Sequence, residues 1–322
     1  MRKNILKSIG FLLGLIVVLL LSSNVTVTYG LGFLQDPYTK MSDVTDAPAN
    51  TYDYFFIGDS ECSTSVTPIE IWQNFGYTGY NCGIPGQRLG DTYSWLKKCI
   101  KNQSPKYVFL ETNALFREIT YMKEIEDSVA FKMSDVFPIF RYHNDWLNID
   151  ITSLWENRED QINDSSQPTI AGYKYNAKIS PYTNGDYVTK TKAKAKLRDK
   201  PLLYLNKIME LCKERDIQLV FYSAPSPVCW NYSKHNAAEA FAKENNLEYL
   251  DFNTQINEIG IDWSKDTRDK GNHINYHGAK KLTTYIGNYL LKSNKLVDHR
   301  GDALYDSWNK DLETYLEAIK TK

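Results

Sequence analysis

The sequence predicts an α/β protein built on a parallel sheet with helices on both faces. Short runs rich in aromatic and β-branched residues alternate along the chain with longer segments of helical spacing. Polar turns follow several of these runs, and in open parallel sheets ligands bind beyond the carboxyl ends of the strands. The turns after the strands are therefore where chemistry is expected.

The elements are assigned in chain order. Before residue 117, strands are predicted over 52–57, 79–81 and 107–110, with one helical segment between Gly58 and Phe75 and another over 91–101. After residue 200, helices over 201–215, 236–244 and 277–291 alternate with strands over 217–222 and 248–252. Residues 117–200 break this alternation, and we interpret them as an insertion that covers one side of the site.

The N-terminus carries the basic residues Arg2, Lys3 and Lys7 before an apolar run over residues 9–21. This pattern indicates an export segment, which can span a bilayer when its flanks are included. No clear cleavage site follows, so we expect residues 1–30 to remain as a single-pass anchor in the cell membrane; a removed signal peptide is the alternative. The positive flank would stay inside, which places the body on the extracytoplasmic side.

Composition narrows the class of function. The chain has 322 residues, with 38 basic and 39 acidic side chains and a formal charge of −1, so no nucleic-acid partner is expected. Its five cysteines include no C-x-x-C pair, and no metal ion or other cofactor is expected. Cys62 and Cys82 are either joined in a disulfide or present as two buried thiols. Residues 31–51 are expected to be a linker, and residues 52–322 one domain that contains the insertion.

Three strand-end turns carry complementary chemical groups. Ser60, in Gly58-Asp59-Ser60, would place a nucleophile at the start of a helix, where free backbone N–H groups point outward; the plain alternative is that Ser60 only caps that helix. The turn around Gly86 lets a backbone amide approach a substrate, and Asn113 offers a side-chain amide at the end of the third strand. Both are also common residues of ordinary turns.

A fourth group lies directly before the last predicted helix. His273 follows Asp269 by four residues in a polar loop, and the two would supply the base and the orienting carboxylate that a serine nucleophile requires. Four such elements in this chain order favour a serine-dependent site. His277 follows His273 by four residues, but no third cluster of ligands accompanies them, so a metal site is discounted.

On these motifs the chain resembles the SGNH/GDSL hydrolase superfamily over about residues 52–291, with the insertion as the weakest part. Ser60 in G-D-S matches the nucleophile block, Gly86 and Asn113 match the oxyanion glycine and asparagine, and His273 in H-I-N-Y-H-G-A matches the histidine block. The resemblance implies a flavodoxin-like three-layer sandwich, the SGNH hydrolase fold. It also implies ester or acyl-transfer chemistry without a metal.

A narrower resemblance concerns the substrate. G-D-S-E after a membrane anchor is similar to membrane-anchored proteins of surface-polysaccharide acyl transfer, including the D-alanine-transfer protein of teichoic acid synthesis. This resemblance implies an acylated cell-surface glycan or a small ester as substrate, and a multi-span membrane acyltransferase as partner. Arg141 and His143 are candidates for lining the pocket. Five aromatic residues would stack on sugar rings, although core packing is the simpler explanation of each: Tyr142, Trp146, Trp155, Trp230 and Tyr232.

Two positions depart from the family pattern. The family acid lies three residues before its histidine, where this chain has Lys270, so the orienting group is Asp269 first, Asp266 second, or a backbone carbonyl. The usual glycine two residues before the oxyanion asparagine is Glu111, which would narrow substrate choice, bind a sugar hydroxyl, or pair with Arg117. These departures motivate a different reading, a catalytically silent carbohydrate-binding or assembly partner; a plain lipase is a third reading.

The expected mechanism is acyl transfer through serine. His273 would take the proton of Ser60 as the hydroxyl attacks an ester carbonyl, while the N–H groups of Ser60 and Gly86 and the amide of Asn113 hold the oxyanion. A covalent acyl-enzyme results. Water as the acceptor would make the protein an esterase, and a sugar hydroxyl would make it an O-acyltransferase.

Overall fold

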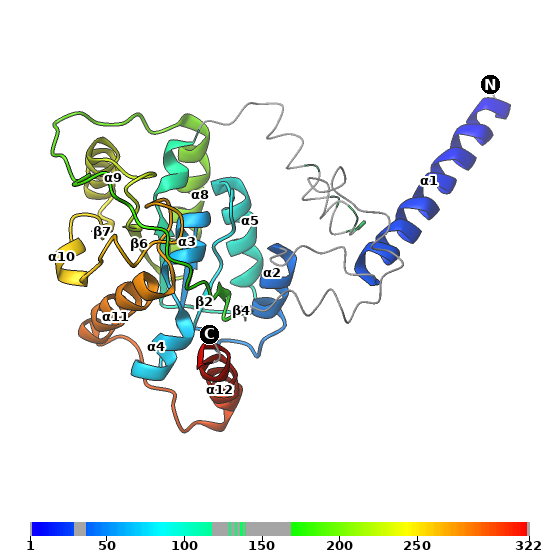
Figure 1. Cartoon of the computed structure of the whole chain (residues 1–322). Coiled ribbons are helices and arrows are strands. Elements are labelled where there is room, and N and C mark those ends of the chain that lie inside the picture. The colour runs from blue at the N-terminus through cyan, green and yellow to red at the C-terminus, as the bar shows by residue number, and fades with distance from the viewer. Residues whose placement is uncertain are drawn as a thin grey trace. The chain divides into compact units, whose positions relative to one another are not determined.

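The structure is a computed structural model of the chain and describes residues 2–28, 37–117, 129, 133, 136–137, 139 and 169–320 (Figure 1). The chain divides into two compact units, which comprise Met1–Thr39 with Ile119–Ser166, and Lys40–Glu118 with Gln167–Lys322. The second unit contains the sheet and the strand-end turns from which the site was predicted.

Helix α1 (Arg2–Thr28) contains the basic leader and the apolar run. Its segment Lys3–Ser23 has a mean hydropathy of 2.5, and its apolar window is not buried. At about 1.5 Å per residue, these 21 residues reach across roughly 30 Å, the thickness of the hydrocarbon core of a bilayer. By length and composition, α1 can therefore cross a membrane.

A parallel sheet forms the centre of the second unit, with its strands in the order β2-β1-β3-β6-β7. The strands are β1 (Tyr54–Ile57), β2 (Gly79–Asn81), β3 (Tyr107–Glu111), β6 (Gln218–Ser223) and β7 (Glu248–Asp251). Counted along the chain within this sheet, the order is the flavodoxin-like 2-1-3-4-5, in which ligands bind where the strand order reverses. The predicted fold class is confirmed, and the reversal lies between β1 and β3.

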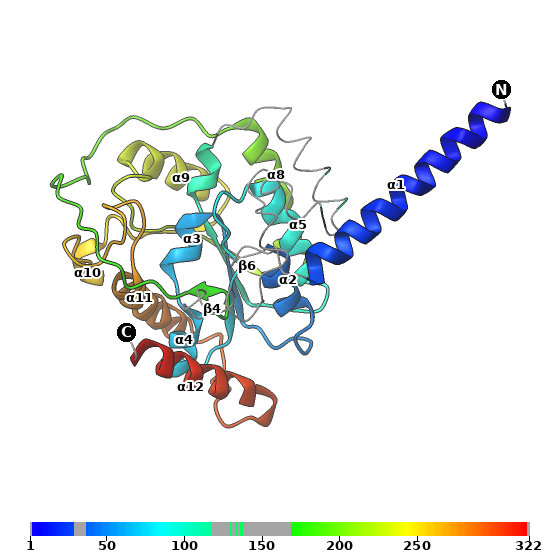
Figure 2. The ribbon, with the colours of Figure 1, turned by 45° about the vertical axis from the view of Figure 1, so that its right-hand side comes forward.

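Helices cover both faces of the sheet because successive side chains of a strand point to opposite sides (Figures 1 and 2). Tyr54 and Phe56 belong to one hydrophobic core, and Phe55 and Ile57 belong to the other. The first core includes residues of α4 (Pro68–Phe75) and α11 (Tyr276–Ser293). The second core includes residues of three further helices, α5 (Leu89–Cys99), α8 (Asp199–Glu214) and α9 (Tyr232–Glu244).

Several elements differ from the sequence-based expectation. The helical segment after Gly58 is divided into α3 (Ser60–Ser65) and α4, because Val66 is extended and Pro68 begins the second helix, where its missing N–H costs little. Helix α12 (Asp306–Lys320) was not predicted, and its Trp308 and Tyr315 are buried. The other unpredicted elements are short: β4 (Thr169–Ile170), β5 (Tyr173–Lys174), η1 (Asn113–Phe116), α10 (Ile256–Ile259) and η5 (Ala303–Tyr305).

Helix α2 (Pro37–Thr45) lies within the segment that was expected to be a linker. Val44 is fully buried in the core and Lys40 is only 3% exposed. Burial lowers the pKa of Lys40 to about 8. Its ammonium donates hydrogen bonds to three backbone carbonyls, those of Asn81 (3.2 Å), Gly83 (2.8 Å) and Gly172 (2.6 Å). From Lys40 onward, this segment is therefore part of the packed body.

Cys62 and Cys82 are both buried free thiols. Burial raises the pKa of each thiol, so both remain protonated at neutral pH. Of the two alternatives that the sequence left open, the structure has the pair of buried thiols.

Candidate active site

Ser60 begins helix α3 directly after strand β1. Asp59 is the N-cap residue of this helix, and its carboxylate accepts a hydrogen bond from the N–H of Glu61 at 3.0 Å. The Ser60 side chain is half-buried, and its carbonyl accepts the hydroxyls of Ser63 and Thr64. The capping role that was the plain alternative for Ser60 thus belongs to Asp59.

Gly58 allows the chain to turn sharply between β1 and α3. Its φ is +153°, and a Cβ at this position would lie 2.7 Å from Cβ of Glu111 and 3.0 Å from Cβ of Cys62. A larger residue would push α3 away from β3, so only glycine lets Ser60 lie this close to the end of the neighbouring strand.

His273 and Asp269 form a close pair at the same edge of the sheet. Nδ1 of His273 lies 2.6 Å from Oδ2 of Asp269, and the backbone N–H of His273 donates to Oδ1 at 2.6 Å. Asp266 instead pairs with Lys281 at 2.6 Å and accepts the N–H of Asp262. Of the acids considered from the sequence, Asp269 is the one that contacts the imidazole.

The loop that carries this pair explains the unusual spacing of four residues. Lys270 and Gly271 both have left-handed backbone conformations, with φ of 60° and 88°. The hydroxyl of Thr267 accepts the N–H of Gly271 (2.8 Å) and donates to the carbonyl of His273 (2.9 Å), which closes the loop on itself. Because the chain curls here, a carboxylate four residues before the histidine reaches both its backbone and its ring.

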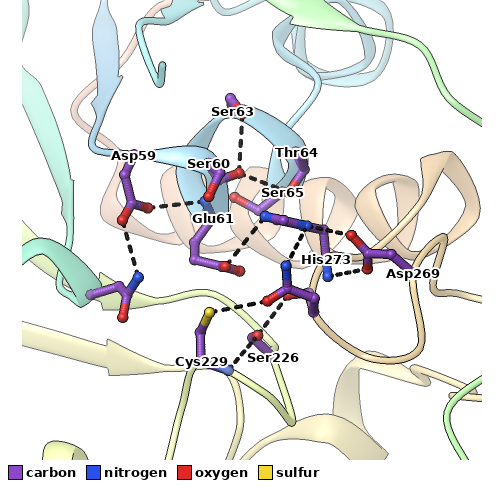
Figure 3. A network of polar contacts seen from close by, with 12 residues as sticks. Asp59, Ser60, Glu61, Ser63, Thr64, Ser65, Ser226, Cys229, Asp269 and His273 are labelled. Carbon is purple, nitrogen blue, oxygen red and sulfur yellow. Dashed lines mark hydrogen bonds and ion pairs between the residues drawn. The ribbon is translucent and has the colours of Figure 1, made fainter. Parts of the chain in front are cut away.

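Glu61 is the residue that faces the free nitrogen of this histidine. Oε1 of Glu61 lies 3.5 Å from Nε2 of His273, and neither atom has a hydrogen-bond partner within the described ranges (Figure 3). Glu61 is 2% exposed, and burial together with the nearby Asp59 raises its pKa to about 8. The expected hydrogen bond between Ser60 and His273 is not formed here, because Nε2 points to the side chain that follows Ser60.

Three acidic side chains meet where β1 and β3 end. Asp59, Glu61 and Glu111 are all buried, and burial together with the other two acids raises the pKa of Glu111 well above its ordinary value. Arg117 compensates this charge through Asp59, with which it pairs at 2.7 Å. The expected alternative of a Glu111–Arg117 pair is therefore wrong; Glu111 instead accepts the backbone N–H of Asn113 at 2.7 Å.

The two predicted oxyanion donors differ in position. Nδ2 of Asn113 donates one of its two N–H groups to Asp59 at 3.0 Å, and the amide oxygen accepts a hydrogen bond from Lys234 at 3.2 Å. The second N–H of the amide can therefore be directed at a substrate. Gly86 is exposed in a turn closed by the N–H of Gln87. The glycine that packs tightly against α3 is Gly83, where a Cβ would lie 2.4 Å from the N atom of Ser63.

Sequence reasoning missed Cys229 and Lys234, which lie beside Glu61. They line a small cavity of about 10 Å³, enough for about one water molecule, together with Glu61, Glu111 and Asn113. Sγ of Cys229 lies 3.2 Å from Oδ1 of Asn272, and burial raises the pKa of the thiol to about 12. Neither residue belongs to a motif, so only the folded structure could bring them to the site.

The predicted substrate-lining residues Arg141, His143 and Trp146, with Tyr142 and Trp155, lie outside the described residues. Trp230 is 7% exposed and donates its indole N–H to Asp251 at 2.9 Å, as expected for a core residue. In the part of the chain that the structure describes, no group of three or more His, Cys, Asp or Glu side chains is arranged to hold a metal ion.

The chain matches no protein-family model and shows no significant similarity to curated proteins. Among solved structures, it is similar to a protein assigned to the G-D-S-L lipolytic family from Desulfitobacterium hafniense, with a TM-score of 0.41, 16% identity, and coverage of 74% of this chain and 99% of that one. It is also similar to a GDSL-like lipase from Bacteroides thetaiotaomicron, with a TM-score of 0.41, 13% identity, and coverage of 80% of this chain and 98% of that one. At these scores the matches carry no functional conclusion, and the site is interpreted from its own geometry.

Proposed function

We propose that the chain is an extracytoplasmic serine esterase or O-acyltransferase that acts on acyl esters of a cell-surface glycan through Ser60, His273 and Asp269. The observation that carries the proposal is the direction of the imidazole. Asp269 holds Nδ1, which turns Nε2 toward the first turn of α3, 3.5 Å from the residue next to Ser60. A histidine oriented by a carboxylate beside a serine at a strand-end turn is the arrangement that acyl transfer requires.

The proposed reaction has two halves. Ser60 Oγ attacks the ester carbonyl carbon as His273 Nε2 takes the hydroxyl proton, and the N–H groups of Ser60, Gly86 and Asn113 stabilise the oxyanion. The C–O bond of the ester then breaks, His273 returns the proton to the leaving alcohol, and the acyl group remains on Ser60. Water or a glycan hydroxyl next attacks this acyl-enzyme, giving its proton to His273, which returns it to Ser60.

Glu61 adds a step before the chemistry. Because its pKa is raised to about 8, the Glu61 carboxyl is mostly protonated at neutral pH and faces the basic nitrogen of His273. For Nε2 to accept the Ser60 proton, this contact must open. In the resting site the base thus faces Glu61 at 3.5 Å without a hydrogen bond, and in this proposal substrate binding next to Ser60 turns it to the serine.

The membrane part of the proposal rests on helix α1. As an uncleaved anchor with its basic end inside, α1 would hold the catalytic unit at the outer surface, where glycan esters are found. A multi-span membrane acyltransferase would be the donor of acyl groups if the reaction is a transfer.

The experiment compares parent and variants with p-nitrophenyl acetate and with a fluorophosphonate that labels activated serines. The full chain in a non-ionic detergent should turn over the ester and gain one label, and Ser60→Ala should lose both activities. Ser63→Ala, on the same helix turn, is the matched control and should keep the label. Equal rates of ester turnover for the parent and Ser60→Ala would exclude catalysis through Ser60.

A silent carbohydrate-binding or assembly partner is the second candidate. The observation in its favour is that, among the described residues, Ser60 Oγ makes no hydrogen bond with His273, whose Nε2 faces Glu61 instead. The same comparison decides between the two candidates, since a silent protein would show neither Ser60-dependent turnover nor labelling.

A further inference from the structure

A second cavity, of about 300 Å³, lies beside the start of β1, at the edge of the sheet opposite to Ser60. Its walls come from α2, the residues before β1, the hairpin of β4 and β5, and α12. The volume is at the lower end of the range of about 300–1,000 Å³ that small-molecule sites occupy. Four of the lining residues are aromatic: Tyr52, Tyr80, Tyr305 and Trp308.

The aromatic rings meet at steep angles. The Tyr52 ring lies 6.0 Å from Tyr80 with an interplanar angle of 82°, and 6.1 Å from Trp308 with an angle of 73°. Tyr80 and Trp308 are 2% and 9% exposed, so packing holds these walls in place. Rings set nearly at right angles offer both faces and edges to a guest, and the faces carry the negative end of the ring quadrupole.

Two carboxylates complete the lining, Asp43 from α2 and Asp311 from α12. Asp43 accepts the hydroxyl of Tyr80 at 2.6 Å, and within the described ranges neither acid forms an ion pair. Lys40 acts on Asp43 electrostatically, but its ammonium donates to three backbone carbonyls. Partial burial and the charge of Asp43 raise the pKa of Asp311, as expected for two carboxyl groups that line the same cavity.

We propose that this cavity binds a small organic cation with an ammonium group, held between the aromatic walls and the carboxylates of Asp43 and Asp311. Ring faces attract alkylated ammonium groups, most strongly where water is excluded, and each carboxylate adds Coulombic attraction. A divalent metal ion fits this lining less well, because it requires a shell of oxygen ligands. The proposal is independent of the chemistry at Ser60.

The test is isothermal titration of the full chain with choline and with its neutral isostere 3,3-dimethylbutan-1-ol. The detergent must be non-ionic, because zwitterionic detergents carry the quaternary ammonium group under test. Choline should bind at least about tenfold more tightly than the isostere, and its affinity should fall with added salt. Asp311→Asn should weaken choline binding about fivefold or more, since it removes one of the two charges.

Glu313→Gln is the matched control, because Glu313 is exposed on the same helix and does not line the cavity. It should bind choline as the parent does. Trp308→Leu should also lose choline binding, and a melting curve identifies a failure to fold. Asp311→Asn, which conserves the shape of the side chain, keeps the test decisive in that event. Equal affinity for choline and its isostere, undetectable binding of choline, competition by Ca²⁺ but not by tetramethylammonium, or an unchanged Asp311→Asn variant would each overturn the proposal.

Discussion

Asp269 holds His273 at two points, with one carboxylate oxygen 2.6 Å from Nδ1 and the other 2.6 Å from the backbone nitrogen. The pair therefore orients the ring and fixes the loop at the same time. A hydrogen bond at Nδ1 leaves Nε2 as the nitrogen that can exchange a proton with Ser60 or with a substrate. This relationship makes the role of the orienting acid directly testable.

Asp269→Asn should lower kcat for p-nitrophenyl acetate by at least about 100-fold, because an amide neither stabilises the imidazolium nor fixes the same tautomer. Asp266→Asn is the matched control, since Asp266 pairs with Lys281 and not with the histidine. It should lower the melting temperature while kcat stays near that of the parent. A larger kcat loss for Asp266→Asn than for Asp269→Asn would show that Asp266, and not Asp269, orients the histidine.

Asn113→Ala should reduce kcat by about 100- to 1,000-fold, equivalent to about 3 kcal/mol of barrier, with little change in KM, because the second N–H of its amide would bind the developing oxyanion and not the ground-state substrate. Lys234→Met should show a smaller effect of the same kind, since Lys234 holds the amide oxygen at 3.2 Å. Steady-state kinetics separate the two parameters. A rise in KM with kcat unchanged would place Asn113 in substrate binding instead.

Glu61→Gln should increase turnover of the small ester at pH 7 by about three- to tenfold. A protonated carboxyl can give its proton to Nε2 of His273 and so keep the base from accepting the Ser60 proton, whereas an amide cannot. The substitution conserves shape in a position that is 2% exposed. The measurement is kcat/KM across pH 5–9 for the parent and the variant. A loss of activity in the variant would show that Glu61 contributes to the reaction rather than restrains it.

The same residue should make the stability of the fold depend on pH. Burial raises the pKa of Glu61 from 4.5 to about 8, so the folded chain binds this proton more tightly than the unfolded chain. The stabilisation is fully present below about pH 4.5 and is lost as pH rises through 8.

We therefore expect the melting temperature of the parent to fall between pH 5 and 9, and that of Glu61→Gln to fall less. Some decrease should remain in the variant, because burial also raises the pKa of Glu111. Differential scanning fluorimetry in one detergent measures both proteins. Parallel curves for the two proteins would contradict the raised pKa of Glu61.

The sequence predicted the sheet well because its strands are short runs that are buried on both faces, as in Tyr54–Ile57. It predicted the contact of Asp269 with His273 only as one of three choices, because the left-handed turn at Lys270 and Gly271 decides which acid reaches the ring. Polar residues caused the main errors. Helix α2 was taken for a linker because it has few apolar residues.

Glu61 was missed for a different reason. Its neighbour Ser60 carried the motif, and nothing in the local sequence shows that a histidine more than 200 positions later faces the glutamate instead of the serine. The turn with Gly83 and Gly86 gives a second example. The local sequence does not show which of these two glycines packs against α3, and only the structure does, because a Cβ at Gly83 would lie 2.4 Å from the N atom of Ser63. Contacts between distant segments, rather than local propensity, determine such details.

The buried ammonium of Lys40 determines where the chain can be shortened for recombinant production. A fragment starting after Thr45 would delete Lys40 and Val44, leaving the carbonyls of Asn81, Gly83 and Gly172 without their donor and a gap in the core. A fragment that starts just before Pro37 would lack the apolar segment Lys3–Ser23 but would keep Lys40 as the donor to these carbonyls. The α2 residues from Lys40 to Thr45 therefore belong to the part of the chain that must be kept for folding.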